Sequence, residues 1–218
     1  MLARRIFTTV VGRRHYAMVK KQVLVAITDG NEEIELIAPI DILRRAGIDV
    51  TIASCAQSTT VTLAQGVKIV ADATIEDVRS KIFDCIVVPG GRGSANLAES
   101  QTLIGMLKTQ QHDNRFIGAI CAAPFNVLQK HGMLQNRKAT CYPAFADRLD
   151  NCVMPKMGDP HEVVISNHVI TSRGPGTAIQ FGLSLTAALM GKAKADEIAE
   201  KLLAKFHMPS VCDFQMID

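Results

Sequence analysis

Short apolar runs alternate with helix-like segments along most of this chain, and this alternation limits the possible folds more than any other feature of the sequence. Residues 22–28 read QVLVAIT and residues 85–88 read CIVV, which are nearly continuous apolar runs of strand length. Parallel strands that are covered by helices on both faces have this composition. The chain therefore predicts an α/β sandwich with a mostly parallel sheet and helices on both faces.

The remaining elements follow from the same patterns. Strands are expected at residues 22–28, 49–55, 85–88, 116–120, 138–142, 162–166 and 169–172, the last two as a hairpin, with a smaller hairpin at 61–63 and 67–71. Helices are expected from the cap Asn31 to Gly47, after the capping-box pair Thr74 and Asp77, and at residues 101–110, 123–130, 176–190 and 196–205. One stripe of the first helix consists of Ile34, Ile37, Ile40 and Leu43.

Length and charge favour a single globular domain, which we expect to span residues 21–218. Of the 218 residues, 48% are hydrophobic and 21% are charged, which is enough to build a core. No apolar run approaches the ~20 residues of a membrane span. The net charge of +3 comes from the first 21 residues, and no basic face with aromatic residues supports nucleic-acid binding.

Residues 1–20 differ from the rest of the chain. They contain Arg4, Arg5, Arg13 and Arg14, and the first acidic residue is Asp29. Arg-rich, acid-free segments that can form a basic amphipathic helix are typical of mitochondrial transit peptides. We expect mitochondrial targeting, with a disordered basic tail as the alternative. Met18 offers a second start, which would give a cytoplasmic form.

The six cysteines form neither a C-x-x-C pair nor a zinc-binding spacing with histidine. They are Cys55, Cys85, Cys121, Cys141, Cys152 and Cys212. A chain of this size does not need disulfides for stability, so free thiols in a reducing compartment are expected.

Cys121 is the strongest candidate for a reactive residue. It lies where the apolar run at 116–120 meets a predicted helix that has Pro124 in its first turn. Such a strand-to-helix turn resembles a nucleophile elbow, which exposes a side chain at the carboxyl edge of the sheet. The positive end of the helix is expected to favour the thiolate. The alternative is a buried structural cysteine.

Two further segments are expected to end at the same edge of the sheet. Pro89, Gly90 and Gly91 follow the CIVV run, and free N–H groups there would hold an oxyanion, unless the glycines only form a turn. Glu35 lies just beyond the first strand, where burial would raise its pKa and let it donate a hydrogen bond to the Cys121 sulfur. The alternative is a solvent-exposed helix residue. No histidine falls on a strand end at this edge, so a Cys–His dyad is not predicted.

These motifs together resemble the parkinsonism-associated deglycase family of the ThiJ/PfpI superfamily. The blocks that carry the resemblance are DGNEEIELIAPIDILRRAGIDV (29–50), VVPGGRGSANL (87–97), AICAAP (119–124) and TSRGPGTAIQF (171–181). The resemblance implies a flavodoxin-like sandwich, a homodimer and no cofactor or metal. It also implies an oxidation-sensitive nucleophile at Cys121, a carboxyl partner at Glu35, backbone donors at Gly91 and Ala122, and a dimer-contact arginine at Arg45.

The chain departs from the family pattern in three places. Tyr142 stands where a histidine often lies near the cysteine, and a phenol that titrates near pH 10 is a poor base. Gln65 stands where many relatives carry an arginine. The tail beyond Lys192 is longer than in close relatives.

Two functions use the same parts. In the first, the Cys121 thiolate adds to glyoxal, methylglyoxal or their early adducts on proteins, and Glu35 transfers the proton, which is the glyoxalase or deglycase activity that the resemblance implies. In the second, the chain is a redox sensor or redox-regulated chaperone in which Cys121 is oxidised to sulfinic acid. Both would protect against oxidative and carbonyl stress.

Overall fold

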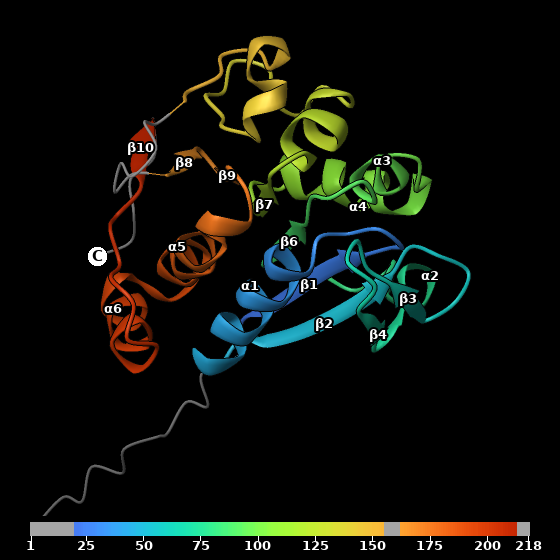
Figure 1. Cartoon of the computed structure of the whole chain (residues 1–218), viewed down its shortest axis with the longest axis horizontal. Coiled ribbons are helices and arrows are strands. Elements are labelled where there is room, and N and C mark those ends of the chain that lie inside the picture. The colour runs from blue at the N-terminus through green and yellow to red at the C-terminus, as the bar shows by residue number, and fades with distance from the viewer. Residues whose placement is uncertain (1–19, 155–161, 213–218) are drawn as a thin grey trace, which may run out of the picture.

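The computed structural model describes residues 20–154 and 162–212, so the predicted targeting segment lies outside the described residues except for Lys20. Its larger sheet has the order β10-β8-β9-β7-β6-β1-β2-β5, with helices on both faces (Figure 1). The strands are β1 (Gln22–Ile27), β2 (Asp49–Ser54), β3 (Thr60–Thr62), β4 (Lys68–Val70), β5 (Ala73–Thr74), β6 (Cys85–Val88), β7 (Phe116–Ile120), β8 (Val163–Ser166), β9 (Val169–Ser172) and β10 (Ser210–Cys212).

The helices separate into two layers. They are α1 (Glu33–Arg45), α2 (Ile75–Val78), α3 (Ser94–Leu97), α4 (Gln101–His112), the π-helix η1 (Pro124–Gln129), the 3₁₀ helices η2 (Pro143–Arg148) and η3 (Pro175–Thr177), α5 (Ala178–Met190) and α6 (Lys192–Lys201). Helices α1, α5 and α6 share one apolar cluster with the sheet, and α2, α3, α4 and η1 share the other. In β1, Val23 and Val25 face the first cluster and Leu24 faces the second, so the continuous apolar run reflects burial on both faces.

Parallel pairing places the ends of the central strands at common edges. β1 pairs in parallel with β2 and β6, β6 with β7, and β7 with β9, whereas β8 and β9 are antiparallel. The carboxyl ends of β1, β6 and β7 therefore meet at one edge. The mostly parallel sheet with helices on both faces confirms the predicted α/β sandwich.

Most elements lie where the sequence predicts them. The small hairpin is β3–β4, the second hairpin is β8–β9, and Thr74 and Asp77 form the predicted capping box. Five of the predicted free cysteines, Cys55, Cys85, Cys121, Cys141 and Cys152, are free thiols in the structure. No helix in this described part of the chain is long and apolar enough to cross a membrane.

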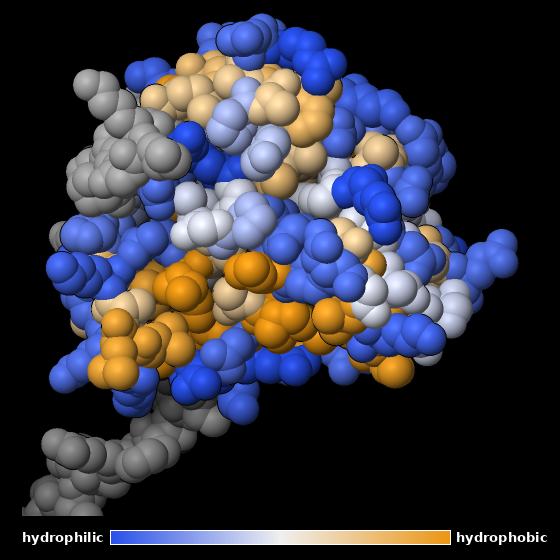
Figure 2. Space-filling model, viewed as in Figure 1, coloured by the Kyte–Doolittle hydropathy of each residue, from blue (hydrophilic) through white to orange (hydrophobic). Residues whose placement is uncertain are grey.

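The first helix differs from its prediction in two respects. Its cap is Glu32, whose carboxylate accepts the Glu35 N–H, because the Asn31 side chain is used elsewhere. Ile34 and Ile37 are 54% and 45% exposed, so the predicted apolar stripe is only half buried. An apolar band crosses this face of the molecule (Figure 2).

Several other boundaries were predicted wrongly. Within the part of the chain that the structure describes, residues 138–142 form one bridge, between Ala139 and Cys152, and the Thr140 N–H donates to the Thr171 side chain instead of to a backbone carbonyl. The helix at 123–130 is a π-helix, and the last helix begins earlier, at Lys192. The short α3 and β10 were not predicted.

Candidate functional site

Cys121 lies directly after β7, at the predicted strand-to-helix turn. Its φ angle is +64°, an unfavourable value for a residue with a side chain, and strain of this kind is concentrated at functional sites. Two backbone hydrogen bonds hold it there, since its N–H donates to the Ser172 carbonyl at 3.0 Å and its carbonyl accepts the Tyr142 N–H at 2.8 Å. The residue is 8% exposed. The sulfur is therefore fixed in a nearly closed position at the carboxyl edge of the sheet.

Glu35 faces Cys121 from the first turn of α1. It is fully buried, and its side chain is hydrogen-bonded to that of Cys121. Its Oε2 accepts the Gly90 N–H at 3.0 Å, and its Oε1 has no hydrogen-bond partner among the described residues. The alternative of a solvent-exposed helix glutamate is wrong.

The two glycines after β6 allow this close approach. A Cβ on Gly90 would lie 2.5 Å from both the Cys121 Cβ and the Glu35 Oε2. Gly91 has a φ angle of +74°, and a Cβ there would lie 2.6 Å from the Gly30 carbonyl oxygen. The N–H groups of Gly91 and Ala122 both hydrogen-bond to the Cys121 sulfur. The structure thus brings Cys121, Glu35, Gly91 and Ala122 together, which is the arrangement that the family resemblance implied.

Asn31 also shapes the site, in a way that sequence reasoning missed. Its buried side chain accepts the Thr28 N–H at 2.7 Å and donates to the Gly90 carbonyl at 2.8 Å. This ties the end of β1 to the glycine loop that touches Cys121. The only signal in the sequence was an asparagine between a strand and a helix, which is equally typical of a helix cap.

Burial dominates the electrostatics of the pair. It raises the pKa of Glu35 from 4.5 to about 7. Burial also raises the pKa of the Cys121 thiol, and the charge of Glu35 raises it further, whereas the N–H groups of Gly91 and Ala122 lower it. The backbone N–H at the start of the helix favours the thiolate, as predicted, but burial and the charge of Glu35 outweigh it. Near pH 7 the Glu35 carboxyl is therefore about half ionised while the thiol keeps its proton, and a thiolate forms when Glu35 takes the proton from sulfur.

The departures from the family pattern lie around this centre. Tyr142 is half exposed. Its ring lies at the rim of the site, because a Cβ placed on Gly174 would lie 3.4 Å from the Tyr142 Cδ2 and 3.9 Å from the Glu35 Oε1. The Gln65 N–H donates to Glu33, and Arg45 pairs with Asp41 on the exposed side of α1.

The four described histidines lie elsewhere. His112 contacts Asp113, His131 contacts the Ala98 carbonyl, His168 lies against the Phe116 ring, and the His207 N–H donates to Gln180. Within the described residues, no group of three His, Cys, Asp or Glu side chains could hold a metal ion.

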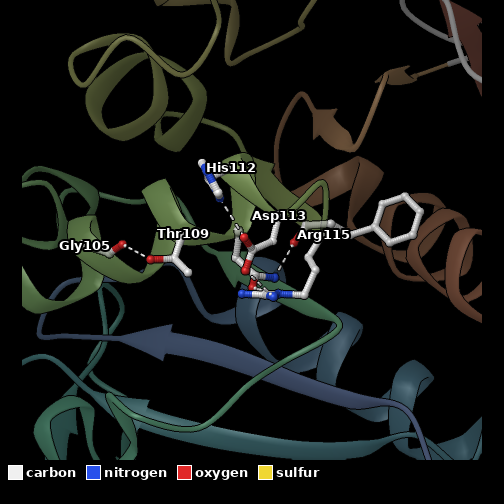
Figure 3. A network of polar contacts seen from close by, with 7 residues as sticks. Gly105, Thr109, His112, Asp113 and Arg115 are labelled. Carbon is white, nitrogen blue, oxygen red and sulfur yellow. Dashed lines mark hydrogen bonds and ion pairs between the residues drawn. The ribbon is translucent and has the colours of Figure 1, made fainter.

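A different polar network occupies the opposite edge of the sheet, just before β7. The Asp113 carboxylate lies between the His112 ring and the Arg115 guanidinium, at 2.7 and 2.6 Å (Figure 3). Arg115 also lines a surface hollow whose other basic residues are Arg79 and Lys81. Because β7 separates this network from Cys121, it takes no part in the cysteine site.

Comparison with known proteins agrees with this geometry. Residues 21–188 match the DJ-1/PfpI family. Protein DJ-1 homolog B of Arabidopsis thaliana is 39% identical over 84% of this chain, and the chain spans 41% of that relative. The glutathione-independent glyoxalase DJR-1.2 of Caenorhabditis elegans is 39% identical over 87% of this chain and 100% of its own length.

A solved structure shows the same fold. Oxidized Toxoplasma gondii DJ-1 superposes with a TM-score of 0.81, at 40% identity, over 85% of this chain and 100% of that one. The matched family segment contains Glu35, the glycine loop and Cys121. The chain therefore belongs to the DJ-1/PfpI family.

Proposed function

We propose that this protein is a cofactor-independent glyoxalase or protein deglycase in which Cys121 is the nucleophile and Glu35 the general acid and base. The observation that carries the proposal is the buried contact between a strained cysteine and a carboxyl group whose pKa is about 7. A group of that pKa can both accept and return a proton at neutral pH. The worm relative named as a glyoxalase supports the choice of substrate class.

The steps follow from the positions of the groups. Glu35 takes the Cys121 proton while the sulfur adds to the aldehyde carbon of methylglyoxal, which forms a hemithioacetal. Glu35 then moves a proton from the first carbon to the second, while the hydroxyl proton of the first carbon passes to the oxygen of the second, and this leaves a lactoyl thioester on sulfur. Water hydrolyses the thioester to lactate and frees the thiol. The Gly91 and Ala122 N–H groups contact the sulfur in the free protein. During the reaction they would donate to the substrate oxygen that becomes negatively charged when the sulfur adds.

Turnover of methylglyoxal to lactate by the purified protein tests this function. We expect turnover by the native protein and none by Cys121→Ser, with Asp113→Asn as the active control because Asp113 lies at the opposite edge of the sheet. Equal lactate formation by the native protein and Cys121→Ser would contradict the mechanism.

The second candidate function is redox sensing with chaperone activity. The same backbone donors and the Glu35 carboxyl would stabilise a sulfinate on Cys121. If the protein produces no lactate but peroxide adds two oxygen atoms to Cys121 and stops there, the sensor function is favoured.

We further propose a homodimer through the apolar band of Figure 2. Ile34, Ile37 and Ile179 on α1 and α5 are 54%, 45% and 45% exposed, which is costly for a monomer. In sedimentation experiments, Ile37→Lys should give monomers. The matched change Ile82→Lys, at a position 74% exposed before β6, should not.

Mitochondrial import is also proposed, on the basis of the Arg-rich segment 1–20. A reporter fused to this segment should enter mitochondria, whereas a chain that starts at Met18 should remain in the cytoplasm. Replacement of Arg4, Arg5, Arg13 and Arg14 by Ala is the matched control, and identical distribution of all three proteins would contradict the proposal.

A further inference from the structure

Cys141 and Cys152 form a second thiol pair, which the proposed function does not use. A backbone bridge joins their segments at Ala139 and Cys152, and the Val153 N–H donates to the Ala139 carbonyl at 2.8 Å. Cys141 lies two residues beyond Ala139, and both residues pack in the apolar cluster on the α4 face, with Cys152 against it. The two thiols are hydrogen-bonded to each other. Cys121 belongs to the cluster on the opposite face of the sheet.

We propose that Cys141 and Cys152 are a reversible disulfide site that peroxides oxidise and thiols reduce. The sulfur of Cys152 attacks the peroxide, the O–O bond breaks, and water leaves once the hydroxide takes up a proton, which gives a sulfenic acid. The Cys141 sulfur then attacks the Cys152 sulfur and displaces the hydroxyl group, which leaves as water with the Cys141 proton. One peroxide is reduced to two waters for each disulfide formed.

Burial decides which sulfur reacts first. Cys141 is fully buried, and burial raises the pKa of its thiol to about 12. Cys152 is partly exposed, so peroxide reaches it more easily. Cys141, held beside it, is in position to act as the resolving thiol. Cys55 and Cys85 are not paired with a second thiol in this way, since the Cys55 thiol is hydrogen-bonded to Ser100 and the Cys85 thiol to the Gly118 backbone.

The location gives the site a structural consequence. Tyr142 follows Cys141 directly, and its N–H donates to the Cys121 carbonyl at 2.8 Å. A disulfide would close the segment 141–152, which includes η2 and carries Tyr142 at the rim of the cysteine site.

The experiment uses the full chain with Cys121→Ser, so its outcome does not depend on the chemistry of Cys121. The folded protein is treated with hydrogen peroxide, blocked with iodoacetamide and digested with trypsin. Cleavage at Lys138, Arg148 and Lys156 places the two cysteines in separate peptides, 139–148 and 149–156. We expect these peptides to appear linked, to separate with dithiothreitol, and the free-thiol count to fall by two per chain.

Two variants make the result specific. With Cys141→Ser, peroxide should oxidise Cys152 to sulfenic and higher acids, because no thiol is present to form the disulfide. With Cys152→Ser, Cys141 should remain a thiol that iodoacetamide alkylates once the protein is denatured. Circular dichroism verifies that both variants fold. Separate alkylation of Cys141 and Cys152 after peroxide treatment, independent oxidation of each sulfur, or equal linkage to Cys55 or Cys85 would overturn the proposal.

Discussion

The two edges of the central sheet each carry a carboxyl group and a buried thiol, but the two carboxyl groups lie in opposite environments. At the carboxyl edge, Glu35 is fully buried without a basic partner, and burial raises its pKa to about 7. At the amino edge, Asp113 is partly exposed between His112 and Arg115, and these hydrogen bonds lower its pKa. Near Asp113, Cys85 pairs with the first residue of β7 and is fully buried.

This difference shows that burial and neighbouring charges, rather than residue type, decide whether a carboxyl group titrates near neutral pH. Asp113 remains ionised throughout the neutral range, so its role is limited to hydrogen bonds and ion pairs with His112 and Arg115. Glu35 can gain or lose a proton near pH 7, which suits acid–base catalysis beside a sulfur. Four experiments test this contrast.

The largest difference is expected between the thiols at the two edges. Brief, limiting iodoacetamide at neutral pH should modify Cys121 at least about a hundredfold faster than Cys85, because Cys121 has a carboxyl group to accept its proton and Cys85 is buried without one. Mass spectrometry of the alkylated peptides measures both rates. Predominant labelling of Cys55, Cys85, Cys141, Cys152 or Cys212 would show that Cys121 is not the reactive cysteine.

The carboxyl groups should differ in how they link stability to pH. Because the folded pKa of Glu35 is about 7 and its ordinary value is 4.5, the folded state binds more protons between these values and loses stability as pH rises. The loss amounts to up to about 3 kcal/mol. In urea unfolding, the stability of Glu35→Gln relative to the native protein should therefore increase from pH 4.5 to 7 and then remain level.

Asp113→Asn is the control for this titration. The lowered pKa of Asp113 gives a stabilisation that is lost only as pH falls toward and below its ordinary value of 3.8, so its difference from the native protein should stay constant between pH 4.5 and 7. Parallel curves for Glu35→Gln and Asp113→Asn would mean that Glu35 ionises as an exposed group does.

From the sequence we could predict which residues meet at the carboxyl edge of the sheet, but not how deeply they are buried or which hydrogen bonds hold them. The apolar runs that became β1, β6 and β7 are local patterns, and they bring Cys121, Gly91 and Glu35 to one edge through parallel pairing alone. The burial of Glu35 and the bond from Asn31 to Gly90 join residues more than 50 positions apart, so no local pattern encodes them. The exposed Ile34 and Ile37 could not be predicted for the same reason. Helical periodicity shows that a helix has an apolar stripe, but not which part of that stripe packs against the rest of the chain.

Glycine substitutions test the packing at the two edges. Gly90→Ala should lower the free energy of unfolding by about 2 kcal/mol, because the added methyl group would lie 2.5 Å from Cys121 and Glu35. Gly105→Ala in α4, where a Cβ meets nothing within 4 Å, should instead raise it by about 0.5–1 kcal/mol. Urea unfolding at one pH compares the two. Equal stability of both variants would show that the glycine loop has room to move away from the cysteine.

The smallest expected effect is a shift in the pH at which Cys121 reacts. In the native protein, Glu35 can accept the thiol proton and return a hydrogen bond to the thiolate. Glu35→Gln removes the charge that raises the thiol pKa but keeps a hydrogen-bond donor, whereas Glu35→Ala removes both. The apparent thiol pKa should therefore be higher in Glu35→Ala than in Glu35→Gln, and Glu35→Ala should oxidise past the sulfinate or stall before it. A charge-assisted hydrogen bond contributes about 1.5–3 kcal/mol, which corresponds to a difference of about one to two pH units between the two variants. The rate of Cys121 alkylation as a function of pH measures this, with Asp113→Asn expected to titrate like the native protein. If Glu35→Ala also titrates like the native protein, Glu35 does not control the proton on sulfur, and the contrast between the two edges does not extend to the chemistry of the cysteine.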